Sequence, residues 1–261
     1  MIDTVKLHYA ELGQGMPIVL IHGFPLAHTI WNAQAEALSD SYRVITPDLR
    51  GHGQSPAPEG VYHMDLLARE IAALLDDLGI EQAVWVAQSM GGYVAMAALR
   101  LFPERFRGIG LVATHPHADS DEKRADRMAA ANSALANGSQ AVADAMLPIL
   151  FAPEFDLESE TAVTLSRLMA RTAPQGIAGA QRGMAARPDS VATLQATTIP
   201  ALVIAGAQDQ IVDPDVSQRM AATMPNAMFV PIEHAGHMPM LEQPDATTDA
   251  LRAFMTTLTS S

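Results

Sequence analysis

Cysteine is absent from the 261-residue chain, which excludes disulfides, thiolate metal sites and a cysteine nucleophile. Basic residues are scarce: 16 Lys and Arg stand against 29 Asp and Glu, giving a formal net charge of −13. Nucleic acids and anionic membranes bind basic surfaces, so we expect neither as a partner. No apolar run reaches the ~18 residues of a membrane span, and the first residues lack a secretion-signal pattern. We therefore expect a cytoplasmic protein.

Apolar residues make up 49% of the chain, and they occur in a regular order. Short apolar runs alternate with longer helical patterns, which is typical of a mostly parallel sheet with crossover helices. Most runs are apolar throughout, as expected for strands covered on both faces. The predicted strands cover residues 18–21, 43–46, 83–87, 109–113, 201–205 and 227–230, and an alternating edge strand covers 6–12. Leucines at helical spacing also predict a helix over 67–78, ended by Gly79.

The strand pattern is interrupted once. From about His115 to Thr198 the chain contains only helical stretches rich in Ala, Met and Leu, separated by Gly138 and several prolines. We therefore predict one core domain, formed by residues 1–114 and 199–261, with a helical cap inserted over residues 115–198.

The most informative stretch is Ala87-Gln88-Ser89-Met90-Gly91, between a predicted strand and an Ala-rich helix. This position is typical of a nucleophile elbow, a sharp turn in which the residues two before and two after the serine must be small. Ala87 and Gly91 meet the requirement, although glycine is usual at both positions. The pentapeptide alone is also compatible with an ordinary helix N-cap at Ser89.

Motifs along nearly the whole chain occur in the order of a known family. They are His22-Gly23-Phe24-Pro25, Asp48-Leu49-Arg50-Gly51-His52-Gly53-Gln54-Ser55, the elbow at Ser89, Gly206-Ala207-Gln208-Asp209 and Gly236-His237-Met238-Pro239. Together they resemble the α/β-hydrolase superfamily, specifically its small serine esterase and enol-lactonase branch. The resemblance implies an α/β-hydrolase fold, in which helices flank a mostly parallel sheet. The N-terminal strands are abbreviated relative to the family's usual eight-stranded sheet, so the strand count stays open.

A serine nucleophile needs a base and a third group that orients the base. The chain order in this fold is serine, then acid, then histidine, and only His234 and His237 follow the acid candidates. His237 follows the last strand as the family's catalytic histidine does, so we predict it as the base and His234 as structural. Asp209 follows an apolar strand and is the predicted acid. Asp213 precedes a proline and is better explained as a helix N-cap.

The family's oxyanion hole uses two backbone N–H groups. The resemblance assigns one to Met90, which follows the nucleophile, and the other to Phe24, because Pro25 has no N–H to donate. No cofactor is implied. The glycine-rich stretch from Asp48 to Ser55 lacks a phosphate-loop lysine, so we interpret it as a structural turn.

His115, His117 and Asp119 are compatible with a metal site, since two histidines flank a proline there. We favour the alternative that these histidines line the entrance of a cleft. In the predicted cap, acidic residues outnumber basic ones, which does not favour an anionic ligand. Lys123 and Arg127 lie four residues apart, with Glu122 and Asp126 beside them, which indicates a solvated helix face.

The sequence thus predicts a cofactor-free carboxylesterase that cleaves esters of small neutral molecules through an acyl-enzyme on Ser89. Enol-lactonase, carbon–carbon bond hydrolase and perhydrolase activities use the same residues and remain alternatives. A non-catalytic, receptor-like member of the fold is a further alternative. Haloalkane dehalogenases and epoxide hydrolases have aspartate at the elbow, so Ser89 argues against both.

Overall fold

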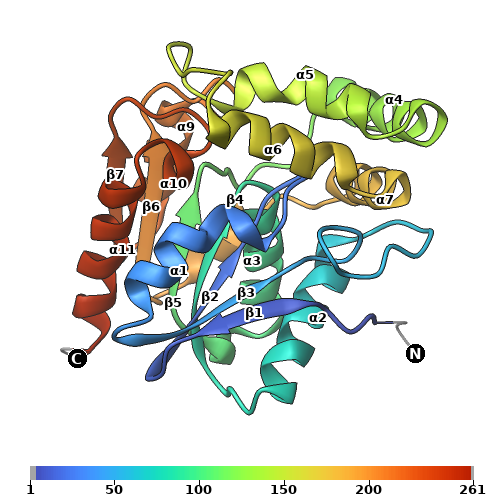
Figure 1. Ribbon diagram of the computed structural model, residues 1–261. Coiled ribbons are helices and arrows are strands. Elements are labelled where there is room, and N and C mark those ends of the chain that lie inside the picture. The colour runs from blue at the N-terminus through green and yellow to red at the C-terminus, as the bar shows by residue number, and fades with distance from the viewer. Residues whose placement is uncertain (1–3, 260–261) are drawn as a thin grey trace.

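The centre of the protein is a sheet of seven strands in the order β1-β3-β2-β4-β5-β6-β7. Figure 1 shows the computed structural model, which describes residues 4–259. Only β1 is antiparallel to its neighbour. The strands are β1 (Tyr9–Leu12), β2 (Met16–Ile21), β3 (Tyr42–Pro47), β4 (Ala83–Gln88), β5 (Phe106–Val112), β6 (Ala201–Gly206) and β7 (Ala227–Ile232). The predicted mostly parallel sheet is therefore confirmed.

The edge strand is shorter than predicted. We expected it to begin at residue 6, but β1 begins at Tyr9, which pairs with Pro47, the last residue of β3. β3 ends at Pro47, and beyond it the Asp48 N–H donates to the carbonyl of His8 at 2.9 Å, so the pairing stops short of residue 6.

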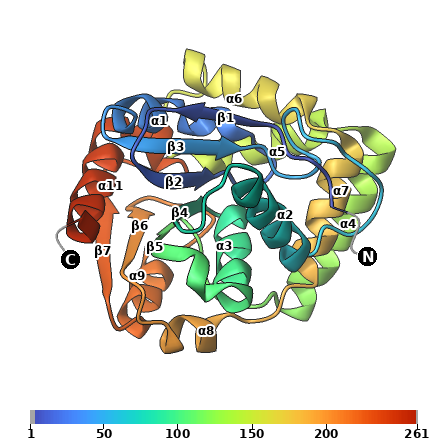
Figure 2. The ribbon, with the colours of Figure 1, turned by 90° about the horizontal axis from the view of Figure 1, so that it is seen from below.

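Helices cover both faces of the sheet, as Figure 2 shows. One face packs on α1 (Asn32–Leu38) and α11 (Pro244–Thr259), and the other on α2 (Met64–Asp77), α3 (Met90–Leu101) and α9 (Pro214–Thr223). Along β2, Ile18 and Leu20 belong to one core cluster, whereas Val19 and Ile21 belong to the other. This alternation explains why the inner strands are apolar at every position.

Between β5 and β6 the chain forms five helices. They are α4 (Asp121–Asn137), α5 (Gln140–Leu150), α6 (Glu160–Arg171), α7 (Pro174–Ala185) and α8 (Val191–Ala196). The first four lie over the carboxyl ends of the parallel strands (Figure 1). The last, α8, lies within the predicted cap range but packs against α3 and α9. The limits of the cap therefore stay a prediction. Among the described residues, no helix is long and apolar enough to cross a membrane.

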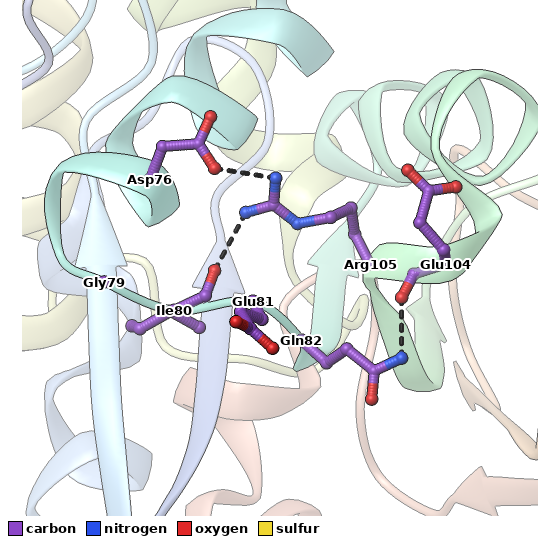
Figure 3. Close-up of a pocket in the computed structure, with 7 residues that line it drawn as sticks. All are labelled: Asp76, Gly79, Ile80, Glu81, Gln82, Glu104 and Arg105. Atoms are coloured by element: carbon purple, nitrogen blue, oxygen red, sulfur yellow. Dashed lines mark hydrogen bonds and ion pairs between the residues drawn. The ribbon is translucent and has the colours of Figure 1, made fainter.

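The pocket in Figure 3 lies at the other end of the sheet, where β4 and β5 begin. Its volume is about 480 Å³, and the carboxyl end of α2 and the short helix η2 (Pro103–Arg105) line it. Arg105 bridges this opening by donating to Asp76 at 2.7 Å and to the carbonyl of Ile80 at 2.8 Å. These bonds join η2 to the end of α2 and to the loop before β4, far along the strands from Ser89.

Candidate active site

Ser89 occupies the sharp turn between β4 and α3. Its φ of 51° and ψ of −116° lie in a region that residues other than glycine rarely adopt. Two hydrogen bonds tie the turn to β5 and the residues after it: Ser89 N–H donates to the carbonyl of Val112 at 2.9 Å, and the Thr114 hydroxyl donates to the carbonyl of Ser89 at 2.9 Å. A Cβ added at Gly91 would lie 2.6 Å from the carbonyl oxygen of His22. The packing thus requires a small residue two positions after the serine.

Asp209 and His237 form a buried pair at the carboxyl ends of β6 and β7. Asp209 Oδ2 lies 2.8 Å from His237 Nδ1, and the two side chains are 0% and 3% exposed. Asp209 Oδ1 accepts the backbone N–H groups of Ile211 and Val212 at 2.8 and 3.0 Å. With every carboxylate oxygen engaged, the imidazole is held with its proton on Nδ1, which leaves Nε2 as an acceptor.

The two alternative residues have other partners. Asp213 N-caps α9, since its carboxylate accepts the backbone N–H of Asp215 at 2.9 Å. His234 has an 80% exposed side chain and lies 3.9 Å from Glu154. The structure therefore pairs Asp209 with His237 and leaves Asp213 and His234 outside this contact.

Gln88 joins the serine turn to the histidine loop. Its amide Nε2 donates to the carbonyl of His237 at 3.2 Å, and both residues are buried. The residue before Ser89 thus contacts the backbone of His237. Sequence reasoning missed Gln88 because the middle positions of the elbow pattern accept any residue.

Glu242 anchors the same loop from the other side. Its Oε1 accepts the backbone N–H groups of Gly236 and Met238 at 2.9 and 3.1 Å, and its Oε2 accepts that of Ala152 at 2.7 Å. Burial raises the pKa of Glu242, and these three hydrogen bonds oppose the rise. The His237 N–H donates to Leu150 O at 2.9 Å. The loop that holds His237 is therefore fixed to the end of α5, a link that no local sequence signal indicated.

The two N–H groups assigned to an oxyanion hole belong to Met90, at the start of α3, and Phe24, in the loop after β2. Met90 is the first residue of α3, where N–H groups have no partner within the helix. Neither the Met90 N–H nor the Phe24 N–H donates to another protein group within residues 4–259. The Phe24 loop is fixed at His22, whose Nε2 accepts the N–H of Leu49 at 2.9 Å. Burial lowers the pKa of His22, which keeps the ring neutral and able to accept this bond.

The structure does not bring His115, His117 and Asp119 together around one point. The His115 Nε2 lies 3.0 Å from the hydroxyl of Tyr93, and His117 Nδ1 lies 3.4 Å from Asp189. Asp119 instead pairs with two arginines, Arg127 at 2.5 Å and Arg187 at 2.8 Å. The separate partners leave no shared metal position for these three side chains.

The predicted solvated face of α4 is confirmed for Glu122, Lys123 and Asp126, which are exposed, but it is wrong for Arg127. The Arg127 side chain is only 14% exposed, and it also donates to Gln181 at 3.1 Å. Asp119 lies before α4 begins, and its nearly buried carboxylate draws Arg127 inward. Because Asp119 is eight residues away and outside the helix, helical spacing did not reveal this contact.

Known proteins resemble this chain along almost its entire length. The family model described as alpha/beta hydrolase fold matches residues 16–244. A 3-oxoadipate enol-lactonase 2 from Acinetobacter baylyi is 34% identical, covering 97% of this chain and 94% of that protein. The structure of a thermophilic esterase from Thermogutta terrifontis, with malate bound, has a TM-score of 0.95 and 38% identity, covering 97% of this chain and 94% of that one. An enol-lactonase from Burkholderia xenovorans has a TM-score of 0.90 and 30% identity, covering 97% of each chain.

Proposed function

The chain belongs to the alpha/beta hydrolase fold family, and we propose that it hydrolyses carboxylic esters of small neutral molecules through an acyl-enzyme on Ser89. The observation that supports this most directly is the buried pair of Asp209 and His237, separated by 2.8 Å. Through Gln88, this pair adjoins the strained turn at Ser89. A nucleophile, a base and an orienting acid are the three groups that acyl transfer needs.

In the proposed reaction, Ser89 Oγ attacks the acyl carbon while His237 Nε2 takes the hydroxyl proton. The N–H groups of Met90 and Phe24 donate to the oxyanion that forms. The ester C–O bond then breaks, and the alcohol leaves with the proton from His237. Water attacks the acyl-enzyme with His237 again as base, which releases the acid and restores the Ser89 hydroxyl. No cofactor takes part in these steps.

The preference for neutral substrates is supported by the arginines near the helical segment. Arg187 donates to the carbonyls of Met184 and His117 and pairs with Asp119, while its guanidinium lies 4.0 Å from the ring centroid of Tyr93. Arg127 pairs with the same carboxylate and with Gln181. Both cations thus have internal partners, whereas recognition of a substrate carboxylate favours a free, bidentate arginine.

The test is turnover of p-nitrophenyl butyrate by the purified protein and by Ser89→Ala. We expect the variant to lose several orders of magnitude in kcat at an unchanged melting temperature. A fluorophosphonate should add covalently to the wild-type chain at Ser89, as peptide mass spectrometry would detect. Retention of most activity in Ser89→Ala would contradict the proposal. No turnover of any ester or lactone would favour a receptor-like role.

A second measurement tests the substrate charge. We expect a higher kcat/KM for a neutral butyrate ester than for an enol-lactone that bears a carboxylate. A higher value for the lactone, lost when Arg127 or Arg187 is replaced by Gln, would assign the activity to an enol-lactonase instead.

A further inference from the structure

Three side chains that the proposed reaction does not use converge beside β1. His8 lies just before β1, His28 begins the short helix η1 (His28–Trp31), and Asp48 follows β3. His28 Nδ1 lies 2.8 Å from Asp48 Oδ1, and His8 Nδ1 lies 3.1 Å from Asp48 Oδ2. One nitrogen or oxygen atom from each residue lies within 4.8 Å of the other two. Nitrogen and carboxylate ligands from three chain segments thus meet at one point.

The Asp48 carboxylate is held rigidly and carries a charge. Its Oδ1 also accepts the backbone N–H of His28 at 2.8 Å, and its Oδ2 accepts that of Gln54 at 2.9 Å. Burial alone would raise the pKa of Asp48, but these hydrogen bonds and the neighbouring histidines hold it well below its usual range. Each carboxylate oxygen therefore accepts one backbone N–H, and its second acceptor direction points toward an imidazole.

Solvent reaches the cluster, and a glycine packs directly against its carboxylate. Gly53 lies against the carboxylate with a φ of 52°, and a Cβ there would lie 2.3 Å or less from the Asp48 carboxylate. The side chains of His8 and His28 are 35% and 14% exposed, so solvent reaches the imidazoles. A side chain at position 53 would displace the carboxylate from the cluster.

We propose that His8, His28 and Asp48 form a binding site for a divalent transition-metal ion such as Zn²⁺. Zinc binds imidazole nitrogen and carboxylate oxygen at about 2.0–2.2 Å in tetrahedral geometry, which places neighbouring ligand atoms roughly 3.3 Å apart. The observed separations of 2.8 and 3.1 Å need only small side-chain shifts to admit the ion. Metal binding through Nδ1 would require each imidazole to carry its proton on Nε2. The backbone donors of His28 and Gln54 would remain as outer-shell partners of the carboxylate.

The opposing explanation is that the histidines only donate hydrogen bonds to a buried carboxylate. Asparagine separates the two roles, because its amide N–H can take the place of the imidazole Nδ1–H but does not replace imidazole as a zinc ligand. His8→Asn and His28→Asn are therefore the informative variants. His117→Asn is the matched control, since His117 Nδ1 also faces a carboxylate, that of Asp189, at 3.4 Å.

The experiment is calorimetric titration of ZnCl2 into the metal-free chain and the three variants, with Co²⁺ absorption spectra as a second readout. We expect one ion per chain and ligand-field bands typical of four-coordinate cobalt. Loss of a partner that only orients a ligand weakens metal affinity about 10–100-fold, so each ligand variant should lose at least tenfold. Melting temperatures should rise with Zn²⁺ in the wild type and in His117→Asn only. The proposal is overturned by the absence of saturable binding, or by affinity that His8→Asn and His28→Asn leave unchanged.

Discussion

The amide of Gln88 donates to the carbonyl of His237 across 149 residues of sequence, at a distance of 3.2 Å. This bond joins the residue before the proposed nucleophile to the proposed base. It is buried, so the carbonyl of His237 has no access to water if the donor is lost.

Replacing Gln88 with Met tests this connection, because Met keeps a similar volume and removes the donor. We expect the free energy of unfolding to fall by about 1–3 kcal/mol, the cost of an unpaired buried carbonyl. We also expect kcat for ester hydrolysis to fall, since the His237 loop loses one anchor. Urea unfolding and steady-state kinetics measure the two effects. Unchanged stability together with unchanged kcat would show that the bond has no role.

Asp209→Asn should reduce kcat by about three to four orders of magnitude, because the amide favours the wrong tautomer of His237. Asp213→Asn should leave kcat nearly unchanged, since Asn is as good an N-cap as Asp. Steady-state kinetics on the same ester compare the two variants. The reverse ranking would show that Asp213 is the orienting acid.

Glu242→Gln should disturb the His237 loop. Only one of the two side-chain oxygens remains, so at least one of the three bound backbone N–H groups must face an amide NH2 group. A displacement of the base by about 1 Å can cost roughly 100-fold in rate, and we expect a 10- to 100-fold lower kcat. Glu154→Gln is the control, because Glu154 is half exposed and contacts only His234 at 3.9 Å in the described structure. Equal kinetics for both variants would argue against a positioning role for Glu242.

Acid sensitivity of the fold should depend on His52. Burial lowers the pKa of His52 to about 3, so the unfolded chain binds this proton near pH 6.5 while the folded chain does not. Stability conferred by the neutral ring is therefore complete above pH 6.5 and declines as the pH falls toward 3. His52→Asn keeps a donor toward the carbonyl of Arg50, which His52 Nδ1 contacts at 3.0 Å. Between pH 6.5 and 5, the variant should lose less stability than the wild type, by up to about 1.4 kcal/mol per pH unit. Urea unfolding at several pH values measures this difference, and parallel curves would refute it.

Gly91→Ala should destabilise the protein more than Gly79→Ala does. At Gly91 a Cβ would lie 2.6 Å from the carbonyl oxygen of His22, whereas at Gly79, with a φ of 67°, nothing lies within 4 Å. Gly79→Ala should therefore lower the free energy of unfolding only by about 1–2 kcal/mol, the cost of a left-handed backbone conformation at a residue other than glycine. Thermal unfolding compares them. A smaller loss for Gly91→Ala would show that the elbow tolerates a side chain there.

Much of the fold was predictable from the sequence because its signals are local. Apolar runs gave all the parallel strands, and the motif order gave the family, which the match over residues 16–244 confirms. The predicted start of β1 was wrong because the true start depends on where β3 ends. The inward turn of Arg127 was missed because it depends on Asp119, outside its helix.

The supporting residues of the site were beyond prediction for a related reason. Gln88 and Glu242 contact backbone atoms of residues that the fold brings near them. Every residue has the same backbone atoms, so the sequence does not indicate which of them a side chain will contact. Likewise, Asp48 lies 20 positions after His28 and 40 positions after His8, which is not a spacing typical of a metal-binding motif. Such contacts emerge only when the strands are placed side by side.

The two ends of the helical segment between β5 and β6 lie side by side, because the Ser190 N–H donates to the carbonyl of Pro116 at 2.8 Å. This hydrogen bond closes a loop formed by residues 117–189. Below it, β5 and β6 pair in parallel with one unbroken register. The entropy cost of closing such a loop grows only slowly with its length. Changes in length within residues 117–189 therefore need not alter the pairing of β5 with β6, provided that Leu150 and Ala152, which hold the His237 loop, stay in place.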